Sequence, residues 1–158
     1  MRNNQTTSYI KDPELRHRYS ISAGGGVVFR LVNGKVEILL IHRRNLWDLP
    51  KGKLNSGESI AHCAAREVSE ESGAELPMIV KKLTSTIHQY EEDGLEIEKI
   101  THWYAMLTRS KSFTPQKEED IDEIRWVFLD EAIDLVGYDN LKIVLQKFKE
   151  AFINYIAM

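Results

Sequence analysis

The chain has 158 residues, of which 21 are basic and 24 acidic, so its formal net charge at pH 7 is −3. This balance argues against a binding protein for long nucleic acids or anionic membranes, and any anionic partner must be held by local groups. The length suits one domain with a single core. The one cysteine, Cys63, cannot form an internal disulfide, and no run of about 18 apolar residues is present. We therefore expect a protein of the reducing cytoplasm, without a membrane segment.

The start of the chain predicts an extension and then a β-hairpin. Residues 1–18 are mostly polar, and we expect them to form a loose N-terminal extension before a single domain over residues 19–158. Two apolar, β-branched runs then flank Asn33-Gly34. This pair is a strong hairpin signal because both residues tolerate positive φ, so the runs predict two paired strands.

A loop and a helix are expected after the hairpin. Residues 45–58 contain proline, glycine and asparagine, and predict a loop. Ser59 is the expected N-cap of the helix and Gly73 its C-terminal stop. The apolar or small residues at helical spacing between them are Ile60, Cys63, Ala64 and Val68.

The second half predicts more strands and a helical C-terminus. Asp93-Gly94 separates two further runs and predicts a second hairpin, and residues 121–129 predict another strand. From about Leu129 the spacing becomes helical. Its apolar stripe predicts core packing, with a homodimer seam as the open alternative, and comprises Leu141, Leu145, Phe148, Phe152 and Tyr155. The order strands, helix, strands, helix predicts a mixed α/β domain with a sheet covered by helices.

Three glutamates, Glu67, Glu70 and Glu71, crowd the end of the predicted helix. At about 100° per residue they share one helix face, so their carboxylates converge. They also lie at the negative end of the helix dipole, where a basic residue would be favoured by about 0.3–1 kcal/mol. Arg66 offsets part of this charge. The cluster indicates either a solvated acidic face or a site for a hard divalent cation such as Mg²⁺, which prefers oxygen ligands.

Residues 52–74 resemble the Nudix box. That motif is a glycine, five residues, a glutamate, seven residues and then Arg-Glu-aliphatic-x-Glu-Glu-x-Gly-aliphatic, and Gly52, Glu58 and the segment REVSEESGA match every charged and glycine position. Ala74 departs from the usual Ile, Leu or Val, which weakens a packing contact and leaves the chemistry untouched. The resemblance extends through AGGGVVF and RWVFLDEA, and so spans most of the chain.

The resemblance implies an α/β/α sandwich with a mixed sheet, and hydrolysis of a phosphoanhydride bond in a nucleoside diphosphate linked to another group. By the match, Glu70 and Glu71 are the expected principal Mg²⁺ ligands, with Mn²⁺ as an alternative metal. Glu67 is expected as a further ligand or as the base for the attacking water. The backbone carbonyl of Lys51 is expected to complete the ligand set.

Other acidic and basic residues receive supporting roles from the same match. Arg66 is expected to orient the glutamates, and Glu58 to hold the loop against the helix. A further ligand or base is expected from the loop before the last strand, where Glu119 is favoured over Glu118 and Asp120. A solvated loop acid is the open alternative for Glu119.

Substrate choice lies outside the box. The segment WDLPKGK resembles a subgroup that acts on dinucleoside polyphosphates, related nucleoside triphosphates and, in some members, diphosphoinositol polyphosphates. The expected phosphate-chain contacts are Arg43, Arg44, Lys51 and Lys53. Trp47 and Tyr90 are candidates for stacking on a base. Of Trp103 and Tyr104, at most one faces the cleft, since neighbouring residues of a strand point to opposite sides.

Several alternatives remain at this stage. The expected partner is a small nucleotide polyphosphate, with no membrane and no long nucleic acid. An ADP-ribose hydrolase and a hydrolase of RNA ends share the same chemistry. A Nudix-like sensor that binds a nucleotide without cleaving it is disfavoured by the intact glutamates.

Overall fold

The computed structural model describes residues 8–10 and 18–156 of the chain, with side chains over residues 18–152. Its strands are β1 (Ser8–Ile10), β2 (Arg18–Val32), β3 (Lys35–Arg43), β4 (Leu46–Asp48), β5 (Lys51–Lys53), β6 (Met78–Glu92), β7 (Leu95–Leu107) and β8 (Ile121–Phe128). Its helices are α1 (Ile60–Ser72), α2 (Leu129–Leu135) and α3 (Asp139–Ile156), and a 3₁₀ turn, η1, covers Lys117–Glu119.

Both predicted hairpins are confirmed. Asn33 and Gly34 join β2 to β3 with φ values of 51° and 77°, and Asp93 and Gly94 join β6 to β7 with φ values of 52° and 75°. Two consecutive positive φ values match the right-handed twist of the flanking strands, which is why asparagine or aspartate followed by glycine serves at these turns.

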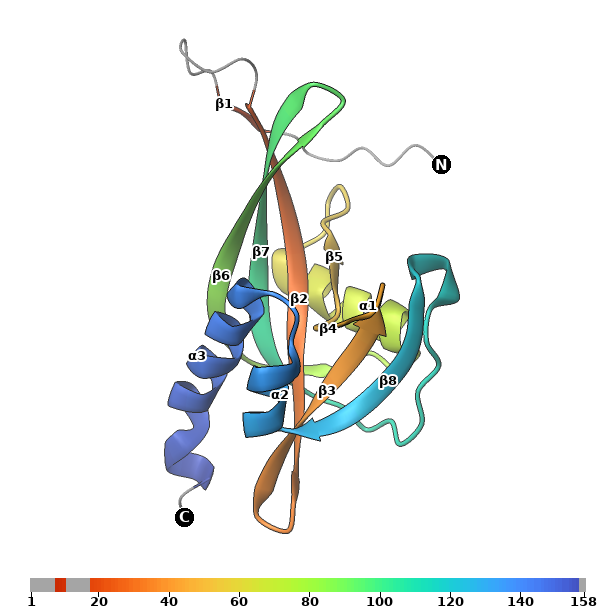
Figure 1. Cartoon of the computed structure of the whole chain (residues 1–158), viewed down its shortest axis with the longest axis vertical. Coiled ribbons are helices and arrows are strands. Elements are labelled where there is room, and N and C mark those ends of the chain that lie inside the picture. Colours follow the sequence, from red (N-terminus) through yellow and green to blue (C-terminus); the bar gives the residue numbers. More distant parts are fainter. Residues whose placement is uncertain (1–7, 11–17, 157–158) are drawn as a thin grey trace.

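The sheet is mixed, as expected. Its main strand order is β4-β3-β2-β7-β6, with β8 paired to β3 (Figure 1). The central pair β2 and β7 is parallel, whereas β2–β3, β3–β8 and β6–β7 are antiparallel. Because β2 pairs with β7 from Arg18 onward, the first long strand begins earlier than its apolar run indicated.

The two faces of the sheet bury separate apolar clusters, since successive strand residues point to opposite sides. Val27, Ile38 and Trp103 pack with residues of α2 and α3 on one face. Val28 and Leu39 pack with residues of α1 on the other. Helices therefore cover both faces, and the predicted α/β/α sandwich is confirmed (Figure 1).

Two predictions near the N-terminal half need correction. The prediction of a loop over residues 45–58 was wrong for β4 and β5, which pair with β3 and β2. Their pairing depends on strands distant in sequence, so local composition could not reveal it. Most of the predicted extension, residues 1–7 and 11–17, lies outside the described residues, whereas residues 8–10 pair with β2 as β1.

The predicted C-terminal helix is divided in two. Gly137 lies between α2 and α3, and its N–H donates to the carbonyl of Trp47 at 3.0 Å. Of the predicted stripe, Leu141, Leu145 and Phe148 are buried in the core, so they are not available for a dimer seam. The side chain of Tyr155 lies outside the described side chains. Among residues 8–10 and 18–156, no helix combines the length and apolar character needed to cross a membrane.

The approach of α1 to β2 leads to a stability prediction. A Cβ atom on Gly24 would lie 2.7 Å from the backbone nitrogen of Ala64 and 2.9 Å from its Cα. Gly24→Ala is therefore expected to lower the free energy of unfolding by about 1–3 kcal/mol, as overpacking does. Urea denaturation measures this change. Ser22→Ala on the same strand is the control, with an expected change within about 0.5 kcal/mol; equal stability of the Gly24→Ala variant and the wild type would contradict this packing.

Candidate active site

Helix α1 places the glutamates of the box on one side of the molecule. The Ser59 hydroxyl accepts the N–H of His62 at 3.1 Å, and Gly73 closes the helix with φ 72°. Both predicted caps are confirmed. The helix therefore runs over the predicted span, and its last turns present Glu67, Glu70 and Glu71 beside β5.

Arg66 is the centre of a polar network that joins the loop to α1. Its guanidinium donates to both carboxylate oxygens of Glu58, at 2.6 and 3.0 Å, and to the carbonyl of Lys53 at 3.1 Å. The same side chain donates to Glu67 at 2.9 Å and to Glu70 at 3.1 Å. The Arg66 guanidinium holds the pKa of Glu58 below its usual range. One cation thus fixes the loop and orients two of the three glutamates.

Glu71 has the most buried carboxylate of the three, with 2% of its side chain exposed. It accepts the backbone N–H of Lys51 at 2.9 Å and lies 3.1 Å from the Arg43 guanidinium. Burial raises the pKa of Glu71 to about 7, against the opposing effect of Arg43 and the Lys51 N–H. This carboxylate is therefore poised to change charge near neutral pH.

Glu67 lies against the glycine that opens the box. A Cβ atom on Gly52 would overlap the Glu67 carboxylate, so any larger residue there would displace that carboxylate from its position. Burial raises the pKa of Glu67, and the hydrogen bond from Arg66 opposes this rise. Glu70, by contrast, keeps 47% of its side chain exposed.

The carboxylate oxygens of these glutamates and the nearby backbone carbonyl are the kind of ligand that a hard divalent cation prefers. In the part of the chain that the structure describes, however, no three Asp, Glu, His or Cys side chains lie where they could hold a metal together. Glu67 and Glu70 both contact Nη1 of Arg66, and Glu71 contacts Arg43. A cation bound by these carboxylates would compete with the two arginines.

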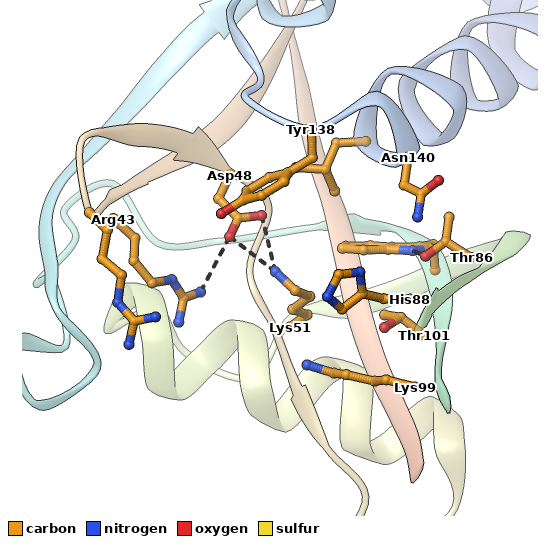
Figure 2. Close-up of a pocket in the computed structure, with 12 residues that line it drawn as sticks. Arg43, Asp48, Lys51, Thr86, His88, Lys99, Thr101, Tyr138 and Asn140 are labelled. Atoms are coloured by element: carbon orange, nitrogen blue, oxygen red, sulfur yellow. Dashed lines mark hydrogen bonds and ion pairs between the residues drawn. The ribbon is translucent and has the colours of Figure 1, made fainter. Parts of the chain in front are cut away.

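A pocket of about 340 Å³ opens beside the carboxylates, between β5, β7 and the start of α3 (Figure 2). Arg43 links the pocket to Glu71 of α1, and Trp103 packs in the same apolar cluster as Leu141 of α3. Trp103 is held by a hydrogen bond from its Nε1 to Thr86 at 2.9 Å. The lining comprises Arg43, Arg44, Asp48, Lys51, Thr86, His88, Lys99, Thr101, Trp103, Tyr138, Asn140 and Leu141.

The charges of the pocket are arranged around one buried acid. Lys51 donates to both oxygens of Asp48, at 3.0 and 3.1 Å, and the Arg43 guanidinium lies 3.8 Å from the same carboxylate. Lys99 reaches the pocket from β7 (Figure 2). Burial, together with the charges of Lys51, Lys53 and Arg43, lowers the pKa of Lys99 to about 8. Positive charge is therefore concentrated next to the glutamates.

Comparison with known proteins identifies the family. A family model described as the NUDIX domain matches residues 24–149. The chain belongs to the Nudix family of hydrolases. It is 31% identical over 151 residues to an 8-oxo-(d)GTP phosphatase of Mycolicibacterium smegmatis. The aligned region covers 87% of this chain but only 44% of that protein. It is 28% identical to an asymmetrical bis(5'-nucleosyl)-tetraphosphatase of Caenorhabditis elegans, over 81% of this chain and 94% of that protein.

A solved structure gives the same result for the Nudix fold. The crystal structure of a C. elegans Ap4A hydrolase binary complex matches with a TM-score of 0.60 and 26% identity, over 85% of this chain and 98% of that chain. The resemblance inferred from the box is thereby confirmed for both family and fold.

Only some of the residues expected to contact the substrate line the pocket. Arg43, Arg44 and Lys51 line the pocket, whereas Lys53, Trp47 and Tyr90 are not among its lining residues. Trp47 packs instead against His42, with ring centroids 4.8 Å apart, and under the Arg125 guanidinium. Tyr90 stacks on His88, which does line the pocket. Of the neighbouring aromatics, Trp103 faces the pocket and Tyr104 faces α1, as the strand alternation predicted.

Glu119 lies near the Nudix glutamates although it is distant in sequence. Turn η1 brings its carboxylate to 3.9 Å from the Arg43 guanidinium. The roles of Glu67, Glu70, Glu71, Glu119 and the Lys51 carbonyl as metal ligands stay predictions.

Several pocket residues were not predicted from the sequence. Lys99, Thr101 and Trp103 are each two residues apart on β7, and so are Thr86 and His88 on β6, so each set shares one face of its strand. This spacing could have indicated from the sequence that they lie together. No local signal indicated Tyr138 or Asn140, which reach the pocket through the packing of α3. The unpredicted residues are Asp48, Thr86, Lys99, Thr101, Tyr138, Asn140 and Leu141.

The raised pKa of Glu71 predicts a pH-dependent stability. Since its folded-state pKa of about 7 exceeds the unfolded value of 4.5, its stabilising contribution is complete below pH 4.5 and is lost as the pH rises through about 7. Glu71→Gln imitates the protonated carboxyl. In metal-free buffer we expect this variant to exceed the wild type by about 1–3 kcal/mol above pH 7, with the gap closing toward pH 4.5.

Thermal unfolding from pH 4.5 to 8 in EDTA measures this difference. Glu70→Gln is the matched control, because the exposed Glu70 side chain predicts a change within about 0.5 kcal/mol. A Glu71→Gln variant that is less stable than the wild type at pH 8 would show that the Arg43 ion pair outweighs burial.

Proposed function

We propose that this chain is a Mg²⁺-dependent Nudix pyrophosphohydrolase that cleaves a phosphoanhydride bond of a nucleotide polyphosphate, with Mn²⁺ as a possible substitute. The observation that carries the proposal is that two sites of opposite charge lie next to each other. One is the carboxylate cluster on α1, and the other is a pocket of about 340 Å³ lined by cationic side chains. Arg43 lies on their boundary, with a guanidinium nitrogen 3.1 Å from Glu71 and 3.8 Å from Asp48. A phosphate chain in the pocket would therefore end beside the glutamates.

The carboxylate cluster would hold the metal. Glu67, Glu70 and Glu71 are the proposed ligands, together with the backbone carbonyl of Lys51 and the carboxylate of Glu119. When bound, a divalent ion supplies a nucleophilic water near neutral pH and neutralises charge that develops on phosphate.

Side chains of the protein would bind the substrate, orient the carboxylates and accept the proton of the attacking water. Arg43, Arg44 and Lys51 bind phosphate oxygens in the pocket, where guanidinium groups give bidentate hydrogen bonds. Arg66 keeps the carboxylates of Glu67 and Glu70 oriented through bonds of 2.9 and 3.1 Å. The raised pKa of Glu67 suits a group that accepts a proton from the attacking water.

The relatives support the nucleotide class of the substrate. The M. smegmatis relative is named as an 8-oxo-(d)GTP phosphatase and the C. elegans relative as a tetraphosphatase of bis(5'-nucleosyl) substrates. Both names describe nucleotides with a chain of phosphates. We extend that class, rather than either individual substrate, to this chain.

Replacement of one exposed glutamate tests the chemistry. Glu70→Gln is expected to lower Mg²⁺-dependent turnover at least about 100-fold, because it removes a charged ligand from the cluster. Its melting temperature in EDTA should match that of the wild type, since the Glu70 side chain is largely exposed. Calorimetric titration with Mg²⁺ should show weakened binding. Glu131→Gln, on the exposed surface of α2, is the control for charge removal.

The substrate is found by ion-exchange analysis of products over a panel. The panel contains diadenosine polyphosphates, canonical and oxidised nucleoside triphosphates, ADP-ribose, diphosphoinositol polyphosphates and RNA with a 5′ triphosphate. Selective cleavage of a nucleotide polyphosphate, lost in Glu70→Gln and in EDTA, supports the proposal. Tight nucleotide binding without cleavage of any compound would identify a sensor instead, and retained turnover in Glu70→Gln would refute the assigned site.

A further inference from the structure

The pocket is lined by four lysine or arginine residues, which outnumber its one aspartate. Lys51 on β5 and Lys99 on β7 both line the pocket. In Figure 2 the ammonium group of Lys51 points toward Asp48, whereas that of Lys99 lies apart from it, with no dashed line to another residue. The charge of Lys99 is therefore available to an anion that occupies the pocket.

Three of the four cations already have carboxylate partners. Arg43 contacts Glu71 at 3.1 Å, Arg44 contacts Asp120 at 3.3 Å and Lys51 contacts Asp48 at 3.0 Å. No carboxylate among residues 18–152 forms an ion pair with Lys99, and its ammonium group has no hydrogen-bond partner in that range. Lys99 thus differs from the other cations of the pocket.

Fold stability does not explain this lysine. Lys99 is partly buried on β7, and the charges that act on it are mainly positive, from Lys51, Lys53 and Arg43, with a smaller opposing effect from Asp48. Like charges in a partly desolvated pocket repel each other, which disfavours the ionised lysine in the absence of an anion. A bound polyanion would instead favour the ionised lysine, and the free energy gained on binding would grow with the negative charge of the substrate.

We propose that Lys99 is a specificity-determining residue, which makes the pocket select nucleotides with three or more linked phosphates over nucleoside diphosphate esters such as ADP-ribose. This inference rests on the proposed nucleotide polyphosphate site and assigns its substrate class. Lys99 binds an oxygen of the phosphate chain, while Arg43 and Lys51 share their charge between that chain and Glu71 or Asp48.

Nucleotide binding without turnover tests the inference. Calorimetry in EDTA compares diadenosine tetraphosphate, with about four negative charges, and ADP-ribose, with about two. The wild type is expected to bind the tetraphosphate more tightly. Lys99→Gln is expected to weaken tetraphosphate binding about 10-fold or more and ADP-ribose binding by less than about 3-fold. Lys99→Arg, which keeps the charge, should retain the preference.

Two further variants and measurements separate the explanations. Lys81→Gln removes an exposed cation of β6 outside the pocket and should change neither affinity. The melting temperature of Lys99→Gln should equal or exceed that of the wild type, because repulsion is relieved. With active enzyme, Lys99→Gln should raise KM for the tetraphosphate and leave kcat unchanged.

The outcomes also separate this inference from the proposed hydrolase activity. A preference for the tetraphosphate that depends on Lys99, in a protein that cleaves nothing, supports the inference and refutes the hydrolase. Equal weakening of both ligands in Lys99→Gln, or no weakening, overturns the inference even when hydrolysis is intact. A Lys99→Gln variant that melts well below the wild type would assign Lys99 a structural role and likewise overturn it.

Discussion

The close packing of α1 on the backbone of β2 is the constraint on which the site depends. Gly24 has no side chain, and a Cβ there would lie 2.7 Å from the backbone of Ala64. Gly52 on β5 similarly leaves space that the Glu67 carboxylate fills. The helix can therefore lie close enough to the sheet for Glu71 to accept the N–H of Lys51. The arrangement of the glutamates therefore depends on the two glycines, which leave room for the helix and for the Glu67 carboxylate.

The second organising feature is the distribution of charge on either side of Arg43. The carboxylates of α1 lie on one side, and the cationic pocket lies on the other. Arg43 contacts Glu71 and approaches Asp48, while its Nε is buried with no hydrogen-bond partner within the described residues. An arginine that leaves one donor unsatisfied is costly for stability. Its position fits the role proposed for it, at the boundary between the carboxylates and a bound phosphate chain.

Much of the fold was predictable because its signals are local. The Asn33-Gly34 and Asp93-Gly94 turns, and the Ser59 and Gly73 caps, require conformations that few residue types adopt, so composition reveals them. Strands β4 and β5 were missed because each has three residues and exists through its pairing with β3 or β2. Short strands gain their hydrogen bonds from distant segments, which no window of sequence contains.

The sequence by itself determined the family, the helix that carries Glu67, Glu70 and Glu71, and the role expected of Arg66, because these residues lie within one short motif. Only the tertiary structure decided the composition of the pocket. It brought Lys99 on β7 and Tyr138 before α3 together with Arg43 at the end of β3, and it placed Trp47 outside the pocket. The physical reason is that a motif on one helix has its geometry set by local hydrogen bonds, whereas a pocket wall is set by strand register and helix packing between segments far apart in the chain.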